Sequence, residues 1–202
     1  MKHDNVDLAA LIGSRICHDL ISPIGAITNG LELLDMAGSF TARPELSLIA
    51  DSVENANARV RFFRIAYGAA GDQILGRAET VSVLDGISRG GRLGCLWGPL
   101  EPQTRAEVRL AFLALQCCET ALPYGGEVRI TAEDGAWEIF GAAEKTNIND
   151  GLWSSLNKPD CASQIPDITA ALVQFALLPA LADDIGRRVQ AVWSETRVSI
   201  RF

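Results

Sequence analysis

The chain has 202 residues, of which 48% are hydrophobic and 21% are charged. A chain of this composition can bury a substantial core, which excludes a disordered protein, a collagen-like repeat and a small disulfide-stapled scaffold. With 25 acidic and 18 basic residues, the formal net charge is -7. We therefore expect no nucleic-acid partner to be attracted by the overall electrostatic field.

Neither an export signal nor a membrane anchor is expected. The longest mostly apolar stretch, 168–182, is interrupted by Gln174 and Pro179, whereas a membrane span needs about 20 apolar residues. The five cysteines include no C-x-x-C pair, which favours reduced thiols over a zinc site or a disulfide framework. These features predict a cytoplasmic protein without membrane insertion.

Residues 1–75 are predicted to form a first domain of two long helices joined by a short loop. Gly38, Ser39 and the pair Arg43-Pro44 mark the break between the helices, and proline is favoured in a first helical turn. Apolar residues recur at steps of three or four along both helices. One side of this apolar surface would stay uncovered in a single hairpin, so we expect a homodimer in which two copies form a four-helix bundle. The apolar positions are Leu8, Ile12, Ile16, Leu20, Ile24, Ile27, Leu31 and Leu34 in the first helix and Leu46, Ile49, Val53, Ala56, Val60, Phe63 and Tyr67 in the second.

Residues 76–202 are predicted to form a second domain, in which glycines and short β-rich runs alternate with helices. Asp134-Gly135 is a strong signal for a hairpin turn between two alternating runs. The predicted order is a mostly antiparallel sheet with helices on one face, an α/β sandwich, which makes the whole chain α+β. The expected strands are 80–84, 93–97, 127–132, 136–140, 187–193 and 196–202, the expected helices 106–122 and 167–184, and the expected irregular connection 147–164.

His18 lies opposite the centre of the apolar stripe on the first predicted helix. Its face of that helix carries small or polar residues, among them Ser14, Ser22 and Asn29. A histidine in this position is exposed to solvent and can be approached by another protein. The spacing alone leaves open that His18 is an ordinary surface histidine.

The run His18-Asp19-Leu20-Ile21-Ser22-Pro23 resembles the H-box of two-component histidine kinases, the phospho-accepting motif His-[Asp/Glu]-Leu-x-x-Pro of a dimerising helical hairpin. A neutral imidazole nitrogen can attack an aspartyl phosphate or the γ-phosphate of a nucleotide. By the same resemblance Asp19 would hold the proton on the other ring nitrogen. A solvated helical carboxylate is the alternative for Asp19.

A cluster of arginines is predicted around the histidine. If the hairpin turns near residues 40–41, position 18 faces the region of residue 63, which carries Arg59, Arg61 and Arg64, while Arg15 lies one turn from His18. Together with Ser22, these side chains are candidates for docking an acidic receiver domain and for attracting phosphate. An ordinary solvated helix face is the alternative.

Residues 110–126 are similar to the helix and glycine turn around the N-box of the histidine-kinase ATPase domain. Counting back from Gly125-Gly126, the magnesium-binding asparagine of that domain would fall near Cys117 and its partner near Leu113. Neither residue supplies the oxygen ligand that Mg²⁺ requires, and the phosphate-binding glycine loops are missing from 147–160. We therefore expect this chain to bind neither nucleotide nor metal.

An H-box hairpin followed by an ATPase-like domain without its nucleotide residues resembles the ChpT-type histidine phosphotransferases. The resemblance implies a homodimer that accepts a phosphoryl group on His18, with Asp19 as a second catalytic residue, from the receiver domain of a hybrid histidine kinase. It then passes the group to response regulators, with Mg²⁺ held by the receiver partner and without ATP hydrolysis or autokinase activity. A receiver-binding scaffold without phosphotransfer, a plain dimeric structural protein and an ATP-dependent histidine kinase are the alternatives.

Overall fold

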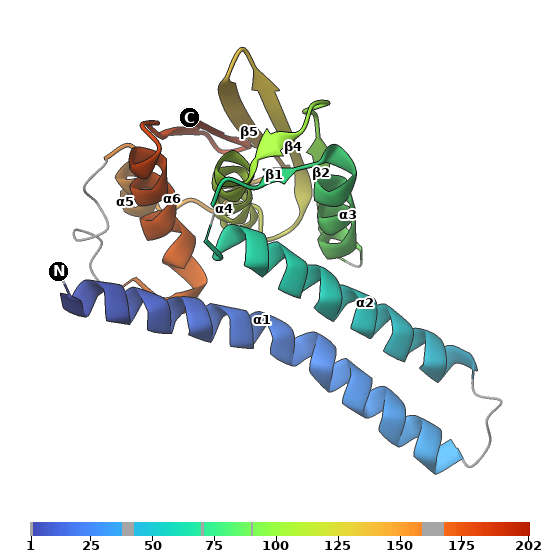
Figure 1. The fold of residues 1–202 in the computed structure, drawn as a ribbon. Helices are drawn as coiled ribbons and strands as arrows, with labels where there is room; N and C mark the ends of the chain where they lie inside the picture. The colour runs from blue at the N-terminus through green and yellow to red at the C-terminus, as the bar shows by residue number, and fades with distance from the viewer. Residues whose placement is uncertain (1, 38–42, 70, 90, 159–167) are drawn as a thin grey trace.

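Two long antiparallel helices form a hairpin that extends from an α/β part of the molecule (Figure 1). The computed structural model describes residues 2–37, 43–69, 71–89, 91–158 and 168–202. Helix α1 spans Lys2–Ala37 and helix α2 spans Arg43–Ala66. Pro44 lies in the first turn of α2, where its missing N–H has no intrahelical partner to lose. The predicted hairpin is confirmed, while the predicted break at Gly38 and Ser39 lies outside the described residues.

The α/β part contains a five-stranded sheet whose order is β2-β4-β5-β7-β6. Strand β2 runs parallel to β4, and the other neighbouring strands are antiparallel. The predicted mostly antiparallel sheet is thus confirmed, and a short ribbon of β1 and β3 lies beside it. The strands are β1 (Ile74–Leu75), β2 (Leu93–Trp97), β3 (Gln103–Thr104), β4 (Gly126–Glu133), β5 (Ala136–Ala142), β6 (Gln190–Trp193) and β7 (Arg197–Arg201).

The turn between β4 and β5 has the chemistry that the sequence predicts. Asp134 and Gly135 have φ angles of 50° and 79°, and Glu133 pairs with Ala136 across them. Two successive positive φ angles define a turn whose twist matches that of the flanking strands, and aspartate followed by glycine adopts it readily. The register of the hairpin follows from this turn.

The helices of the α/β part are α3 (Arg77–Ser88), α4 (Arg105–Ala121), α5 (Asp150–Ser155) and α6 (Val173–Asp184), with a 3₁₀ turn η2 (Ala170–Leu172) before α6. Helix α4 packs against β4, β5 and β7 and against α6. The alternate strand residues that face this layer, such as Val128, Ile130 and Ile139, are fully buried. Burial of one sheet face under helices is the predicted sandwich arrangement.

The prediction of a strand over 80–84 is wrong, because these residues lie within α3. Thr80, Val83 and Leu84 are its buried residues, and steps of three and four are the spacing of one helix face. The β-branched residues in this run favour a strand locally, but packing against α2 and β2 stabilises the helix.

The connection predicted as irregular over 147–164 contains helix α5. Its N-terminus is capped by Asn149, whose Oδ1 accepts a hydrogen bond from the Leu152 N–H at 3.1 Å, and Trp153 on this helix is buried. The capped turn and the buried indole explain why a helix forms in a polar segment. The helix predicted over 167–184 begins later, at η2, and Asp167 lies outside the described residues.

The hairpin and the α/β part share one hydrophobic core. Phe62 of α2 stacks on Phe112 of α4, with ring centroids 4.7 Å apart. Arg109 Nε donates to the carbonyl oxygen of Ala66 at 3.2 Å, and the Arg105 guanidinium donates to that of Arg64. These contacts fix the end of α2 to α4. Within the described ranges, no helix is both long and apolar enough to cross a bilayer.

Candidate functional site

His18 lies on α1 with its ring directed into solvent. Its side chain is 84% exposed, and its Nδ1 atom lies 3.1 Å from Oδ1 of Asp19. An ionised carboxylate only accepts hydrogen bonds, so Nδ1 carries the proton in this contact. When the ring carries no second proton, the lone pair of Nε2 faces an incoming group.

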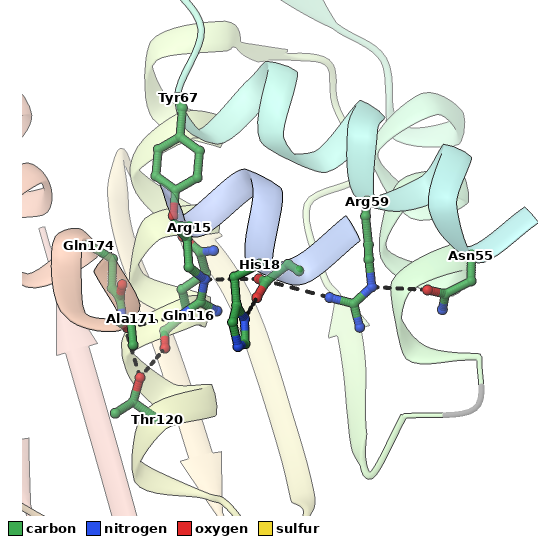
Figure 2. A network of polar contacts seen from close by, with 10 residues as sticks. Arg15, His18, Asn55, Arg59, Tyr67, Gln116, Thr120, Ala171 and Gln174 are labelled. Carbon is green, nitrogen blue, oxygen red and sulfur yellow. Dashed lines mark hydrogen bonds and ion pairs between the residues drawn. The ribbon is translucent and has the colours of Figure 1, made fainter. Parts of the chain in front are cut away.

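Asp19 follows His18 in sequence but is held against the protein, with a side chain that is 12% exposed. Its second oxygen, Oδ2, accepts a hydrogen bond from Arg15 Nε at 2.9 Å and lies 3.9 Å from Arg59 Nη1. Arg59 is itself oriented by Asn55, whose Oδ1 accepts from Arg59 Nε at 2.9 Å (Figure 2). The two carboxylate oxygens of Asp19 thus have separate partners, the imidazole on one side and guanidinium groups on the other.

The structure divides the four predicted docking arginines into two pairs. Arg15 and Arg59 lie at Asp19, and neither is fully exposed. Arg61 reaches Ser82 of α3, donating from Nη1 to Oγ at 3.3 Å, and the Arg64 side chain is exposed. The predicted group of arginines therefore does not surround the imidazole as a set.

An open groove of about 710 Å³ begins at Ser22, one turn from His18, and runs between α1, α2 and α3. Its floor includes Ala58 of α2 and Gly86 of α3, and a Cβ atom on Gly86 would lie 2.6 Å from that of Ala58. The absence of a side chain at Gly86 therefore lets the two helices pack closely. Charged side chains line the groove: Asp51, Glu54, Arg59, Arg61 and Arg89.

A second, smaller cavity of about 90 Å³ lies on the inner side of Asp19. Asp19, Arg59 and Glu119 supply its polar wall, and Phe62, Phe63, Leu93 and Leu115 supply apolar contacts. Its size is a small fraction of what drug-sized ligands occupy. The carboxylate of Asp19 therefore shares this cavity with the aromatic rings of Phe62 and Phe63.

Polar side chains that the sequence analysis missed lie between α1, α4 and α6 (Figure 2). The Tyr67 hydroxyl donates to Gln116 Oε1 at 3.0 Å, and Gln174 Nε2 donates to Thr120 Oγ1 at 3.0 Å. Burial is the main cause that raises the pKa of Tyr67 to about 12, while nearby Arg15 acts in the opposite direction. The i,i+4 spacing of Gln116 and Thr120, within the mostly apolar run 110–121 of α4, was the available sequence signal.

The positions expected to correspond to the metal-binding asparagines lie in the core. Cys117 and Leu113 are fully buried on α4, and burial raises the pKa of the Cys117 thiol well above its usual value. Two polar residues of α4, Gln116 next to Cys117 and Thr120 one turn later, are both hydrogen-bonded within the protein. Among the residues with described positions, no group of three or more His, Cys, Asp or Glu is arranged to hold a metal ion.

Comparisons with known proteins place the fold in the class of histidine phosphotransferases. The family model of the histidine phosphotransferase C-terminal domain matches residues 77–197. The protein phosphotransferase ChpT of Brucella abortus (strain 2308) is 38% identical over 131 residues, which are 63% of this chain and 62% of that protein. The match thus spans less than two thirds of the length of this relative.

A solved structure of a bacterial phosphotransferase is 32% identical, covers 97% of this chain and 95% of its own, and superposes with a TM-score of 0.74. A histidine kinase domain from Erythrobacter litoralis aligns over 94% of this chain and 95% of its own with 13% identity and a TM-score of 0.45, which is a much weaker likeness. The chain belongs to the histidine phosphotransferase family, and the predicted resemblance to ChpT-type proteins is confirmed.

Proposed function

We propose that this protein is the histidine phosphotransferase of a two-component phosphorelay. It accepts a phosphoryl group on His18 from a receiver-domain aspartate and passes that group to response regulators. One observation carries the proposal: the ring of His18 is 84% exposed and paired through Nδ1 with Asp19, which leaves Nε2 free. Membership of the phosphotransferase family supports it.

The proposed chemistry is an in-line displacement at phosphorus. The Nε2 lone pair attacks the phosphorus of the aspartyl phosphate, the N–P bond forms, and the P–O bond to the receiver carboxylate breaks, so that the receiver aspartate leaves as a carboxylate. The positive charge that develops on the imidazole faces the Asp19 carboxylate through the Nδ1 proton, at 3.1 Å. Transfer to a second receiver is the same reaction in reverse.

The proposed division of labour places Mg²⁺ on the receiver partner and requires no cofactor on this chain. Mg²⁺ neutralises phosphoryl oxygens and takes oxygen ligands. The buried side chains of Cys117 and Leu113 cannot supply such ligands. This chain would contribute the nucleophile, its orientation and a docking surface.

The partners proposed are the receiver domain of a hybrid histidine kinase and the receiver domains of response regulators. The groove that starts at Ser22 offers a surface one turn from the histidine, with Arg61 on its wall. The exposed Arg64 adds positive charge on the same helix. These side chains suit an acidic receiver pocket, whereas Arg15 and Arg59 already neutralise Asp19.

We further propose that the protein is a homodimer joined through the hairpin. Large apolar side chains remain exposed along both helices of this single chain, and a second copy in a four-helix bundle would cover them. Exposed patches of this kind on a hairpin mark a protein interface. The side chains are Ile21, Ile24, Leu31, Leu33, Met36, Leu46, Leu48, Val53 and Val60.

Phosphotransfer is tested by mixing the chain with a phosphorylated receiver domain and Mg²⁺, then measuring acid-labile phosphate on the chain and its passage to a second receiver. We expect rapid labelling of the wild type, complete loss in His18→Ala, and wild-type labelling in the matched control His3→Ala. Because the chain has two histidines, this pair assigns the site. Labelling that persists in His18→Ala would assign the phosphate to another residue.

The same mixture separates the alternatives. Binding of the receiver without labelling of the wild type would identify a scaffold. Labelling of the wild type by the γ-phosphate of ATP in the absence of any receiver would identify a kinase. Neither outcome is compatible with the proposed relay.

A further inference from the structure

We propose that Arg15 is a positioning residue that links the α/β part of the protein to the orientation of Asp19 and, through Asp19, to the tautomer of His18. The proposal rests on the proposed function only for its kinetic readout. The sequence suggested that Arg15 docks a partner, whereas its contacts give it an internal role. The structural basis is a chain of hydrogen bonds that runs from α6 through η2 to the imidazole.

The guanidinium of Arg15 bridges two parts of the molecule that are far apart in sequence. Its Nε donates to Asp19 Oδ2 at 2.9 Å, and its Nη1 donates to the carbonyl oxygen of Ala171 in η2 at 2.9 Å. The Arg15 side chain is 15% exposed, and its bond to Asp19 is partly buried, whereas its bond to Ala171 lies at the surface. Because the guanidinium is planar and rigid, the positions of its two acceptors are fixed relative to one another.

The end of this series of hydrogen bonds that is farthest from His18 is anchored in the core. The Ala171 carbonyl also accepts a hydrogen bond from Gln174 Nε2 at 3.1 Å, and the same Nε2 donates to Thr120 Oγ1 at 3.0 Å (Figure 2). Gln174 is fully buried at the start of α6, and Thr120 lies on α4. The acceptor of Arg15 is therefore linked to α6 and, through Gln174, to α4.

The bond from Arg15 to Asp19 determines which oxygen of the carboxylate faces the histidine. With Oδ2 bound to Arg15, Oδ1 is directed at Nδ1 of His18. Arg59 lies farther away, 3.9 Å from the same Oδ2, and so constrains the carboxylate less. Without the fork of Arg15, the carboxylate can rotate toward Arg59 and release the Nδ1 proton contact, after which either ring nitrogen can carry the proton.

The proposal predicts a specific effect of Arg15→Lys. Lysine retains the positive charge but lacks the planar fork that joins Asp19 to Ala171. A ring that spends more time with the proton on Nε2 has no lone pair there for phosphorus. Transfer from a bound receiver should therefore slow, while binding of the receiver should not change.

The experiment uses the full chain in a His3→Gln background, so that His18 is its only histidine. ¹⁵N NMR of the imidazole reports the tautomer, and phosphotransfer from a phosphorylated receiver gives kcat and KM. For Arg15→Lys we expect a shift from the Nδ1–H toward the Nε2–H form and a fall in kcat of about tenfold, with KM unchanged. The matched control, Arg129→Lys, alters an exposed ion pair with Glu127 on β4 and should change neither quantity.

Two results would overturn the proposal. A rise in KM with an unchanged tautomer would make Arg15 a docking residue, and unchanged tautomer and kinetics would leave it only a structural role. If Arg15→Lys does not fold, Gln174→Met removes a donor to Ala171 while leaving Arg15 in place, and it should shift the tautomer in the same direction by a smaller amount. If the wild type takes no phosphate, the proposed function fails, but the NMR measurement still tests the role of Arg15.

Discussion

The imidazole of His18 and the carboxylate of Asp19 are neighbours on α1, joined by a 3.1 Å contact, yet their side chains are 84% and 12% exposed. An exposed imidazole next to a sheltered carboxylate combines access with orientation. A partner can reach Nε2, while the group that holds Nδ1 is constrained by the protein rather than by solvent. In the proposed phosphotransfer, the exposed ring of His18 would provide access and the sheltered carboxylate of Asp19 would provide orientation.

Replacing the Asp19 carboxylate with an amide should slow phosphotransfer strongly. In Asp19→Asn the side chain keeps its size, but it no longer offers a negative charge to the imidazolium or to Arg15 and Arg59. Loss of a positioned proton-holding group costs about 10²-fold or more in rate. Rapid-quench measurement of transfer from a phosphorylated receiver tests this, with circular dichroism to confirm folding.

The exposed carboxylate of Asp72, which follows α2, offers a matched control for that experiment. Asp72→Asn changes the net charge equally and should leave the rate unchanged. Equal rates for Asp19→Asn and the wild type would mean that Asp19 is an ordinary surface carboxylate.

Two glycines in helices should respond to alanine in opposite directions. A Cβ atom on Gly86 would lie 2.6 Å from Ala58 Cβ, whereas one on Gly13 would meet nothing within 4 Å. Gly86→Ala forces α3 away from α2 and should lower the free energy of unfolding by about 1–3 kcal/mol. Gly13→Ala should raise it by about 0.5–1 kcal/mol, and urea denaturation measures both. A stabilising Gly86→Ala would show that the two helices separate at little cost.

The features that could be predicted from sequence are those set by local pattern. Steps of three and four predict the hairpin of α1 and α2. Asp134-Gly135 predicts the turn between β4 and β5. Both signals are read over a few neighbouring residues. The exposure of His18 also follows from its angle on one helix. These local sequence patterns do not depend on which distant segment of the chain packs against them.

The features that could not be predicted depend on contacts between distant segments. The hydrogen bond from Arg15 to Ala171 joins residues 156 positions apart, so nothing near Arg15 distinguishes it from a surface arginine. Helix α4 is buried on almost every side, so its hydrophobicity pattern does not show which polar position bonds to the helical hairpin. Only the fold shows that Gln116, and not its neighbour Cys117, makes the polar contact to Tyr67 of the hairpin.

The proposed dimer predicts that a charge on the hairpin surface separates the two copies. Leu31 and Val53 are exposed on α1 and α2, so Leu31→Glu and Val53→Glu should leave each chain folded while placing carboxylates in the bundle interface. Light scattering after size-exclusion chromatography should give a dimer for the wild type and a monomer for each variant. Val192→Glu, at an exposed apolar residue of edge strand β6, should remain a dimer. A monomeric wild type would contradict the four-helix bundle.

The partly buried phenol of Tyr67 should make the protein less stable at high pH. Its pKa is raised to about 12 in the folded chain, chiefly by burial, from a usual value of 10.0. As the pH rises above that usual value, the unfolded chain loses this proton first, and the free energy of unfolding falls until the folded phenol also ionises. Below the usual value the contribution is fully present. Urea unfolding between about pH 9 and pH 11 measures the loss.

Tyr67→Phe separates this effect from general alkaline denaturation. The variant lacks the hydrogen bond to Gln116 and should be less stable by about 1 kcal/mol at neutral pH. Its stability should decline less than that of the wild type over the alkaline range, because one group whose ionisation opposes folding is gone. Parallel declines in the two proteins would show that Tyr67 ionises equally in the folded and unfolded states, and would place its hydroxyl in contact with water rather than with Gln116.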